Sequence, residues 1–132
     1  RFAAVREIAR HPRIVVTKIE EQLGTLYSAD TLTLLLQNFP LVHFVWLIGS
    51  DNLVQIPHWH DWRHIFSLVP IAAVARPGTA LKARTGTAAQ IFSGARAPAD
   101  KCFATRLPPA WTIIETQRDP ANATQIRAGR GQ

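Results

Sequence analysis

The densest group of side chains that could do chemistry spans residues 58–64, which read His-Trp-His-Asp-Trp-Arg-His. His60 and His64 are four residues apart, so a helix would place both imidazoles on one face, as in some metal sites. No third ligand stands at a recognisable metal-binding spacing, so we expect no metal here. Trp59 could instead stack on a flat heterocycle or pack in the core, and local sequence favours neither. Trp62 lies in an apolar stripe and is expected to pack in the core.

A second candidate site is the Gly-Ser-Asp-Asn segment at residues 49–52, directly after a run of apolar residues. Gly49 would let a ligand approach the backbone closely, and Asp51 could accept hydrogen bonds from ribose hydroxyls. Alternatively, Gly49 only turns the chain and Asp51 only caps the following helix. The spacing alone leaves both interpretations open.

A third candidate lies near the end of the chain, at residues 122–127, Asn-Ala-Thr-Gln-Ile-Arg. A helix starting there would offer free N–H groups to a phosphate, and the Thr124 hydroxyl and Arg127 could add charge-assisted contacts. An ordinary surface helix would have the same sequence. Cys102 has no neighbouring His to activate it and is expected to be an inert thiol.

Alternating strands and helices are expected to position these side chains. Apolar periodicity, β-branched runs and helix-ending prolines define the segments. Helices are predicted at 1–10, 28–39, 61–68, 83–96 (weakened by two glycines) and 122–128, strands at 13–17, 42–48, 71–75 and 111–116, and loops at 20–26 and 97–109. This order predicts an α/β fold with a mostly parallel sheet, in which ligands bind at the carboxyl ends of the strands. Residues 49–52, 76–78 and 119–127 follow such ends.

Composition limits the classes of protein that fit. The 132 residues suggest a single domain, and 47% hydrophobic with 18% charged residues is an ordinary globular balance. No apolar run approaches the roughly 20 residues of a membrane span, so no membrane partner is expected. A single cysteine fits a reducing compartment, and we expect a cytoplasmic protein. The chain begins with Arg1 and contains no Met, from which we expect that an upstream part is absent.

The net charge of +6 lies entirely in residues 76–132, which carry nine basic and three acidic groups. Such an excess favours an anionic partner, either nucleic acid or the phosphates of a small ligand. A nucleic-acid-binding module would interleave aromatic and basic residues on one surface. Here most aromatic residues lie within 39–66, away from the basic excess, so no nucleic-acid partner is expected.

Five segments in order resemble the bacterial nicotinate-nucleotide adenylyltransferases. The matching segments are Leu-Tyr-Ser-Ala-Asp-Thr-Leu at 26–32, the strand ending in Gly-Ser-Asp at 44–53, Trp59, Arg-Pro-Gly at 76–78, and 122–127, which is similar to the family's Ser-Ser-Thr-x-x-Arg signature. The family's catalytic His-x-Gly-His motif does not occur in this sequence. The resemblance implies a Rossmann-like nucleotidyltransferase fold, N-terminally truncated, over one domain at 1–132.

The resemblance also implies a reaction and a pyridine site. ATP would transfer AMP to nicotinate mononucleotide, giving deamido-NAD and pyrophosphate, with Mg²⁺ on the ATP phosphates and no metal held by protein ligands. Trp59 would stack on the nicotinate ring. Ser28, Thr31 and the backbone at Trp59 and His60 would surround its carboxylate. A related adenylyltransferase with another acceptor, such as phosphopantetheine, is the alternative.

The remaining implied positions bind nucleotide. Gly49 and Asp51 would line a ribose, Arg76 would belong to the same site, and Thr124 and Arg127 would hold ATP phosphates. With no His-x-Gly-His motif, no residue of this chain is assigned as catalytic, and we expect the isolated chain to be inactive. No oligomeric state is predicted.

Overall fold

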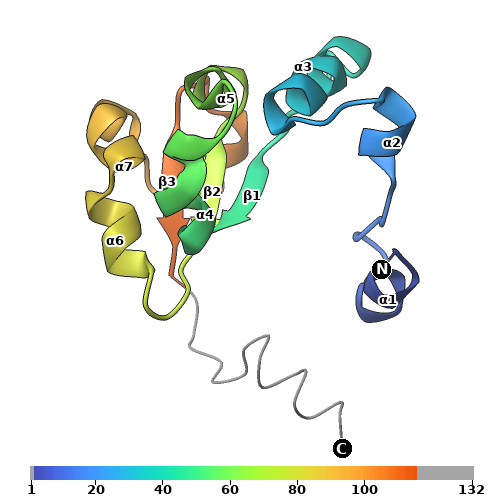
Figure 1. Cartoon of the computed structure of the whole chain (residues 1–132), viewed down its shortest axis with the longest axis horizontal. Helices are drawn as coiled ribbons and strands as arrows, with labels where there is room; N and C mark the ends of the chain where they lie inside the picture. The colour runs from blue at the N-terminus through green and yellow to red at the C-terminus, as the bar shows by residue number, and fades with distance from the viewer. Residues whose placement is uncertain (1, 116–132) are drawn as a thin grey trace, which may run out of the picture.

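The computed structural model describes residues 2–115, and three parallel strands form its centre (Figure 1). The strands are β1 (Trp46–Gly49), β2 (Ile71–Val74) and β3 (Trp111–Ile114), in the spatial order β1-β2-β3. Trp46 pairs with Ile71, and Ile71 pairs with Trp111. All three strands therefore end together, and the predicted α/β fold with a parallel sheet is confirmed.

The described residues also form seven α-helices and three short 3₁₀ segments. Helices α4 to α7 follow β1 and β2 and lie beside the sheet, whereas α1 and α2 lie at the other end of the molecule (Figure 1). The helices are α1 (Phe2–Ile8), α2 (Ile19–Leu23), α3 (Ser28–Asn38), α4 (Ser50–Gln55), α5 (Trp62–Leu68), α6 (Ala80–Thr85) and α7 (Thr87–Ile91), and the 3₁₀ segments are η1 (Ile56–His58), η2 (Ser93–Ala95) and η3 (Phe103–Thr105).

The main core lies between one face of the sheet and helices α3 to α7. Ile65 and Phe66 of α5 are fully buried, and Phe66 stacks on Phe92 with ring centroids 4.2 Å apart. Trp111 of β3 is buried too, and its indole N–H donates to the Phe92 carbonyl at 2.7 Å. Burying each such side chain stabilises the fold by roughly 1.5–3 kcal/mol. As predicted, Trp62 packs against this core.

The strand predicted at 13–17 is wrong. Those residues are irregular, and Ile14 and Val15 are exposed to 54% and 78%. A strand is stabilised by a neighbour that takes up its N–H and C=O groups, and no strand in residues 2–115 lies beside this segment. The loop predicted at 20–26 is also wrong in part, because α2 covers residues 20–23 and Gly24, whose φ is 69°, caps its end.

Two further boundaries differ from expectation. The strand predicted at 42–48 pairs only from Trp46, since Pro70, which has no N–H, stands just before β2 and ends the ladder. The helix predicted at 83–96 is divided into α6 and α7 at Gly86, whose ψ of 176° is extended.

None of the helices in residues 2–115 is long and apolar enough to cross a membrane.

Candidate functional site

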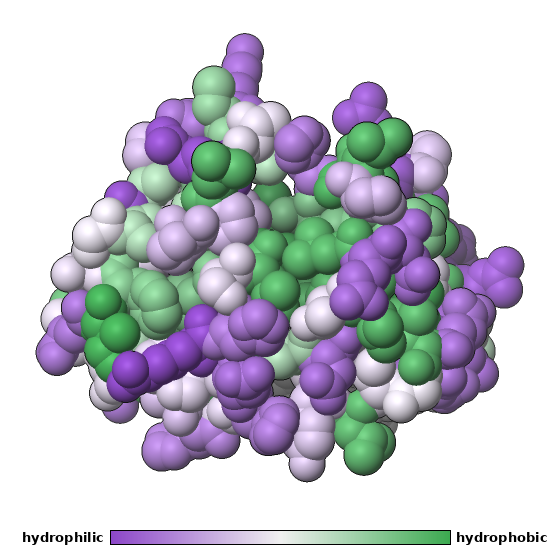
Figure 2. Space-filling view, turned by 90° about the horizontal axis from the view of Figure 1, so that it is seen from above, coloured by the Kyte–Doolittle hydropathy of each residue, from purple (hydrophilic) through white to green (hydrophobic). Residues whose placement is uncertain are grey.

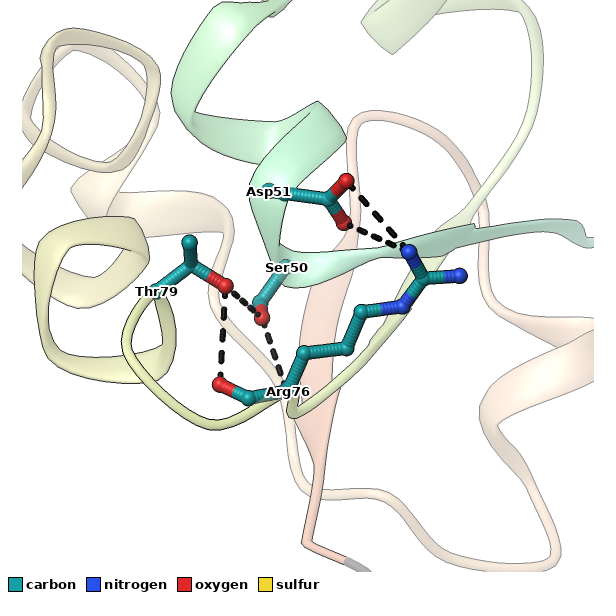
Figure 3. Close-up of polar contacts among 4 residues, drawn as sticks. All are labelled: Ser50, Asp51, Arg76 and Thr79. Carbon is teal, nitrogen blue, oxygen red and sulfur yellow. Dashed lines mark hydrogen bonds and ion pairs between the residues drawn. The ribbon is translucent and has the colours of Figure 1, made fainter. Parts of the chain in front are cut away.

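The carboxyl end of the sheet brings together residues that are far apart in the sequence (Figure 3). Strand β1 ends at Gly49, and α4 begins immediately with Ser50 and Asp51. Arg76 follows β2, and its Nη1 lies 3.3 Å from Oδ1 and 3.4 Å from Oδ2 of Asp51. Because neighbouring parallel strands end at the same edge, a pair separated by 25 residues meets there.

The Asp51–Arg76 ion pair contributes little to the stability of the fold, but it leaves one carboxylate oxygen of Asp51 able to accept a hydrogen bond from a ligand. The Arg76 and Asp51 side chains are 60% and 38% exposed, and exposed pairs contribute about 0–1 kcal/mol. The Oδ1 atom of Asp51 is nevertheless buried and accepts no hydrogen bond from any group in the described part of the chain. Oδ1 faces the Arg76 guanidinium at 3.3 Å without a hydrogen bond, so it can accept one from a ligand.

A tight turn holds Arg76 at this edge. The Thr79 N–H donates to the Arg76 carbonyl at 3.3 Å, closing a four-residue turn. Pro77 and Gly78 occupy its centre, and the φ of 85° at Gly78 matches the left-handed position of a type II turn. Helix α6 begins directly after the turn, so Arg76 is fixed between a buried strand and a helix start.

The end of β3 also carries a charged residue. Glu115 directly follows this strand and forms an ion pair with Arg84 of α6. Charged side chains therefore follow all three strands at one edge, which is where parallel sheets bind polar ligands.

A pocket of about 380 Å³ lies between the start of α3 and the segment after α4. Tyr27, Ser28, Trp59 and His60 are among its lining residues. The rings of Tyr27 and His60 stack with centroids 4.3 Å apart, which joins two walls of the pocket. Figure 2 views the face on which α3 and α5 lie uppermost, and apolar residues line a recess near its centre with hydrophilic residues around it.

Trp59 contacts both the core and this pocket, so the two roles left open by the sequence are compatible. Its ring meets Trp46 edge to face at 5.5 Å, and it is half-buried against the main core. The indole of Trp59 is held by the core on one side and lines the pocket on the other, so it is suited to stack on a flat ring.

Thr31 does not line the pocket. It is buried in α3, where its hydroxyl lies 2.6 Å from the Thr25 hydroxyl and donates to the Tyr27 carbonyl at 3.2 Å. Its contacts therefore fix the loop that carries Tyr27 and Ser28. Ser28 is the first residue of α3, and Tyr27 is the N-cap residue.

The histidine pair at i and i+4 does not form on a helix. Helix α5 begins at Trp62, and Asp61 precedes it with a φ of 53°, which turns His60 away from the helix that carries His64. Across residues 2–115, no group of three or more His, Cys, Asp or Glu side chains is placed to hold a metal ion.

Of the predicted site residues, Ser28, Trp59 and His60 line the pocket, and Gly49, Asp51 and Arg76 meet at the sheet edge. Thr124 and Arg127 lie outside the described residues. Ser50 and Thr79 were missed as parts of the site. No sequence signal identifies them, because their role depends on a contact across 29 residues.

The chain is similar to known proteins over nearly its whole length. A cytidylyltransferase-like family model matches residues 1–129. A protein of Cereibacter sphaeroides (strain ATCC 17025) named "Probable nicotinate-nucleotide adenylyltransferase" is 45% identical over 128 residues, covering 97% of this chain and 69% of that protein. A protein of the same name from Roseobacter denitrificans is 40% identical, covering 99% of this chain and 67% of the relative. The chain thus spans about two thirds of the length of these relatives.

A solved structure has the same fold. The nicotinic acid mononucleotide adenylyltransferase of Plasmodium falciparum, complexed with APC, superposes with a TM-score of 0.53 over 93% of this chain and 52% of its own. The identity is 13%, so this likeness concerns the fold alone.

Proposed function

The chain belongs to the cytidylyltransferase-like family and, within it, to the nicotinate-nucleotide adenylyltransferases, and on that premise we propose that it forms most of an enzyme that adenylates nicotinate mononucleotide. The main support for this proposal is the pocket between the start of α3 and the segment after α4. Ser28, Trp59 and His60 come from segments some 30 residues apart, and they line one cavity together with Tyr27. That cavity offers an indole for a pyridine ring beside polar groups for its carboxylate.

In the proposed reaction, a phosphate oxygen of nicotinate mononucleotide attacks the α-phosphorus of ATP. A new P–O bond forms, the bond from the α-phosphorus to the bridging oxygen breaks, and pyrophosphate leaves. No covalent intermediate with the protein is needed. The protein's part is to orient the two nucleotides and to stabilise the charge that develops on the phosphates.

The pyridine ring would occupy the pocket. Trp59 stacks on it, and Ser28 together with the backbone at Trp59 and His60 hydrogen-bonds its carboxylate. Thr31 does not contact the substrate in this proposal, because its hydroxyl is bonded to the Thr25 hydroxyl and the Tyr27 carbonyl. It acts by holding the loop that carries Tyr27 and Ser28.

The nucleotide would extend from this pocket to the sheet edge. Helix α4 begins at that edge, and η1, which ends at His58 beside the pocket, follows it directly, so the two places are linked by about two helical turns. Gly49 and Asp51 line a ribose, and Oδ1 of Asp51, which accepts no hydrogen bond within residues 2–115, accepts one from a hydroxyl. Arg76 completes this site, and Thr124 and Arg127 hold phosphates of ATP.

Mg²⁺ enters with ATP as part of the substrate. This assignment fits residues 2–115, which supply no cluster of metal-ligating side chains. The excess of basic residues after position 75 provides the opposite charge that two anionic nucleotides require. We further propose that residues 1–132 form a single domain and that the enzyme works in the cytoplasm.

Thermal shift with three acceptors would test the proposal on the full-length protein. We expect nicotinate mononucleotide to raise the melting temperature more than nicotinamide mononucleotide, because only the acid presents a carboxylate to the pocket. Phosphopantetheine should give no shift. A larger shift with phosphopantetheine would instead indicate a related adenylyltransferase with that acceptor, and pyrophosphate release with the preferred acceptor and ATP would establish turnover.

A further inference from the structure

Ser50 is a buried polar side chain that the proposed reaction leaves without a role. It begins α4 at the end of β1, and its side chain is completely buried. Gly49 is the N-cap residue of α4, so Ser50 is the first residue of the helix and its hydroxyl bonds to groups outside α4. A buried hydroxyl must be satisfied, so its partners indicate what it does.

The Ser50 hydroxyl joins two groups of the turn that carries Arg76 (Figure 3). It accepts from the Arg76 N–H at 2.8 Å and lies 2.7 Å from the Thr79 hydroxyl. Thr79 in turn donates its proton to the Arg76 carbonyl at 3.5 Å. When Thr79 donates in this way, its hydroxyl accepts from Ser50 in the 2.7 Å contact, because a hydroxyl has one proton. The chain of hydrogen bonds therefore begins and ends on the backbone of Arg76.

The same short segment also holds the side chain of Arg76. Asp51, the neighbour of Ser50, pairs with the guanidinium. That ion pair is largely exposed and cannot by itself fix a long side chain in one position. The Ser50 contacts are short and start from a fully buried side chain, so they fix the backbone from which the guanidinium extends.

We propose that Ser50 is a positioning residue of the nucleotide site, whose hydroxyl holds the Arg76 backbone so that the guanidinium lies against Asp51 and over Gly49. The effect of Ser50 on the reaction rate rests on the proposed function, whereas its effect on the Arg76 backbone does not. Ser50 touches no substrate in this role and acts through Arg76.

The first test needs no activity. Amide hydrogen exchange is measured by NMR on the substrate-free full-length protein. Ser50→Ala should raise the exchange rate of the Arg76 N–H by about tenfold or less, in line with the modest net worth of one hydrogen bond. Thr79→Val should raise it by a smaller factor, and Thr79→Ser should leave it unchanged. The matched control is Ser67→Ala, whose hydroxyl donates to the His64 carbonyl on α5. An unchanged rate in Ser50→Ala would overturn the proposal.

The second test is a kinetic double-mutant cycle. Ser50→Ala should lower kcat/KM by about three- to tenfold in the wild-type background. In an Arg76→Ala background it should lower kcat/KM less than about twofold, because the group that it positions is gone. Equal factors in both backgrounds would mean that Ser50 acts on folding alone, and the proposal would fail. A wild-type enzyme that releases no pyrophosphate would instead refute the proposed function, and the exchange experiment would still decide the role of Ser50.

Discussion

The guanidinium of Arg76 lies directly against Gly49: a Cβ built on this glycine would stand 2.8 Å from Nε and 2.9 Å from Cζ. The same Cβ would lie 2.4 Å from Oδ1 of Asp51. The φ of Gly49 is −83°, which any residue can adopt, so the requirement for glycine is spatial. The Asp51–Arg76 pair is in place only because position 49 has no side chain.

Gly49→Ala should therefore displace the pair rather than unfold the protein. The groups that a methyl would meet are the ends of flexible side chains, which can move at little cost. We expect kcat/KM in the full-length enzyme to fall by at least about tenfold, with the melting temperature lowered by only a few degrees. Gly94→Ala is the control, since a Cβ there meets nothing within 4 Å. Unchanged kinetics in Gly49→Ala would show that the pair does not contribute to the site.

Trp59→Ala should weaken one substrate selectively. If the indole stacks on the nicotinate ring, KM for nicotinate mononucleotide should rise by about ten- to a hundredfold, with much less change in KM for ATP. Loss of packing against Trp46 would lower stability too, so both constants are measured well below the melting temperature. Trp62→Phe, which alters a tryptophan that packs against Phe66 and Phe92, serves as the control. Equal, small changes in both KM values would assign Trp59 to packing.

Asp51→Ala should separate binding from folding. The carboxylate forms only an exposed ion pair within the described residues, so its removal should leave the melting temperature of the ligand-free full-length protein within about two degrees. Nucleotide affinity should fall by about tenfold or more, because ribose hydroxyls would lose their acceptor. Calorimetric titration with each nucleotide measures the loss. A marked drop in melting temperature without ligand would make Asp51 a structural residue.

The 132 residues on their own should not make the dinucleotide. The His-x-Gly-His motif that the family uses at the α-phosphate does not occur in this sequence. Strand β1 is an edge strand of the described sheet, and Leu47 in it is 63% exposed, so the isolated chain is also expected to aggregate. Pyrophosphate release with nicotinate mononucleotide and ATP measures activity, with a full-length relative as the positive control. Turnover by the isolated chain would show that its catalytic groups lie elsewhere.

Much of this molecule follows from local patterns in its sequence. Apolar, β-branched runs end at Gly49 and Val74, and segments with a 3.6-residue period stand beside them in the sequence, so strands β1 and β2 and helices α3 and α5 could be predicted. The order of the five motifs was likewise sufficient to indicate the family. These features depend on residues that are close together in the chain, where spacing alone carries the information.

Tertiary structure alone decided the rest. Val15 has the composition of a strand residue, yet it lies in an exposed, irregular segment, because pairing depends on a neighbour that no local pattern specifies. Thr31 lies within a matching motif, but a contact with Thr25 takes its hydroxyl away from the pocket. Ser50 lies within the Gly-Ser-Asp segment, yet nothing in the local sequence assigns its hydroxyl a role. It joins the site because two parallel strands end side by side and bring the backbone of Arg76 within hydrogen-bonding distance.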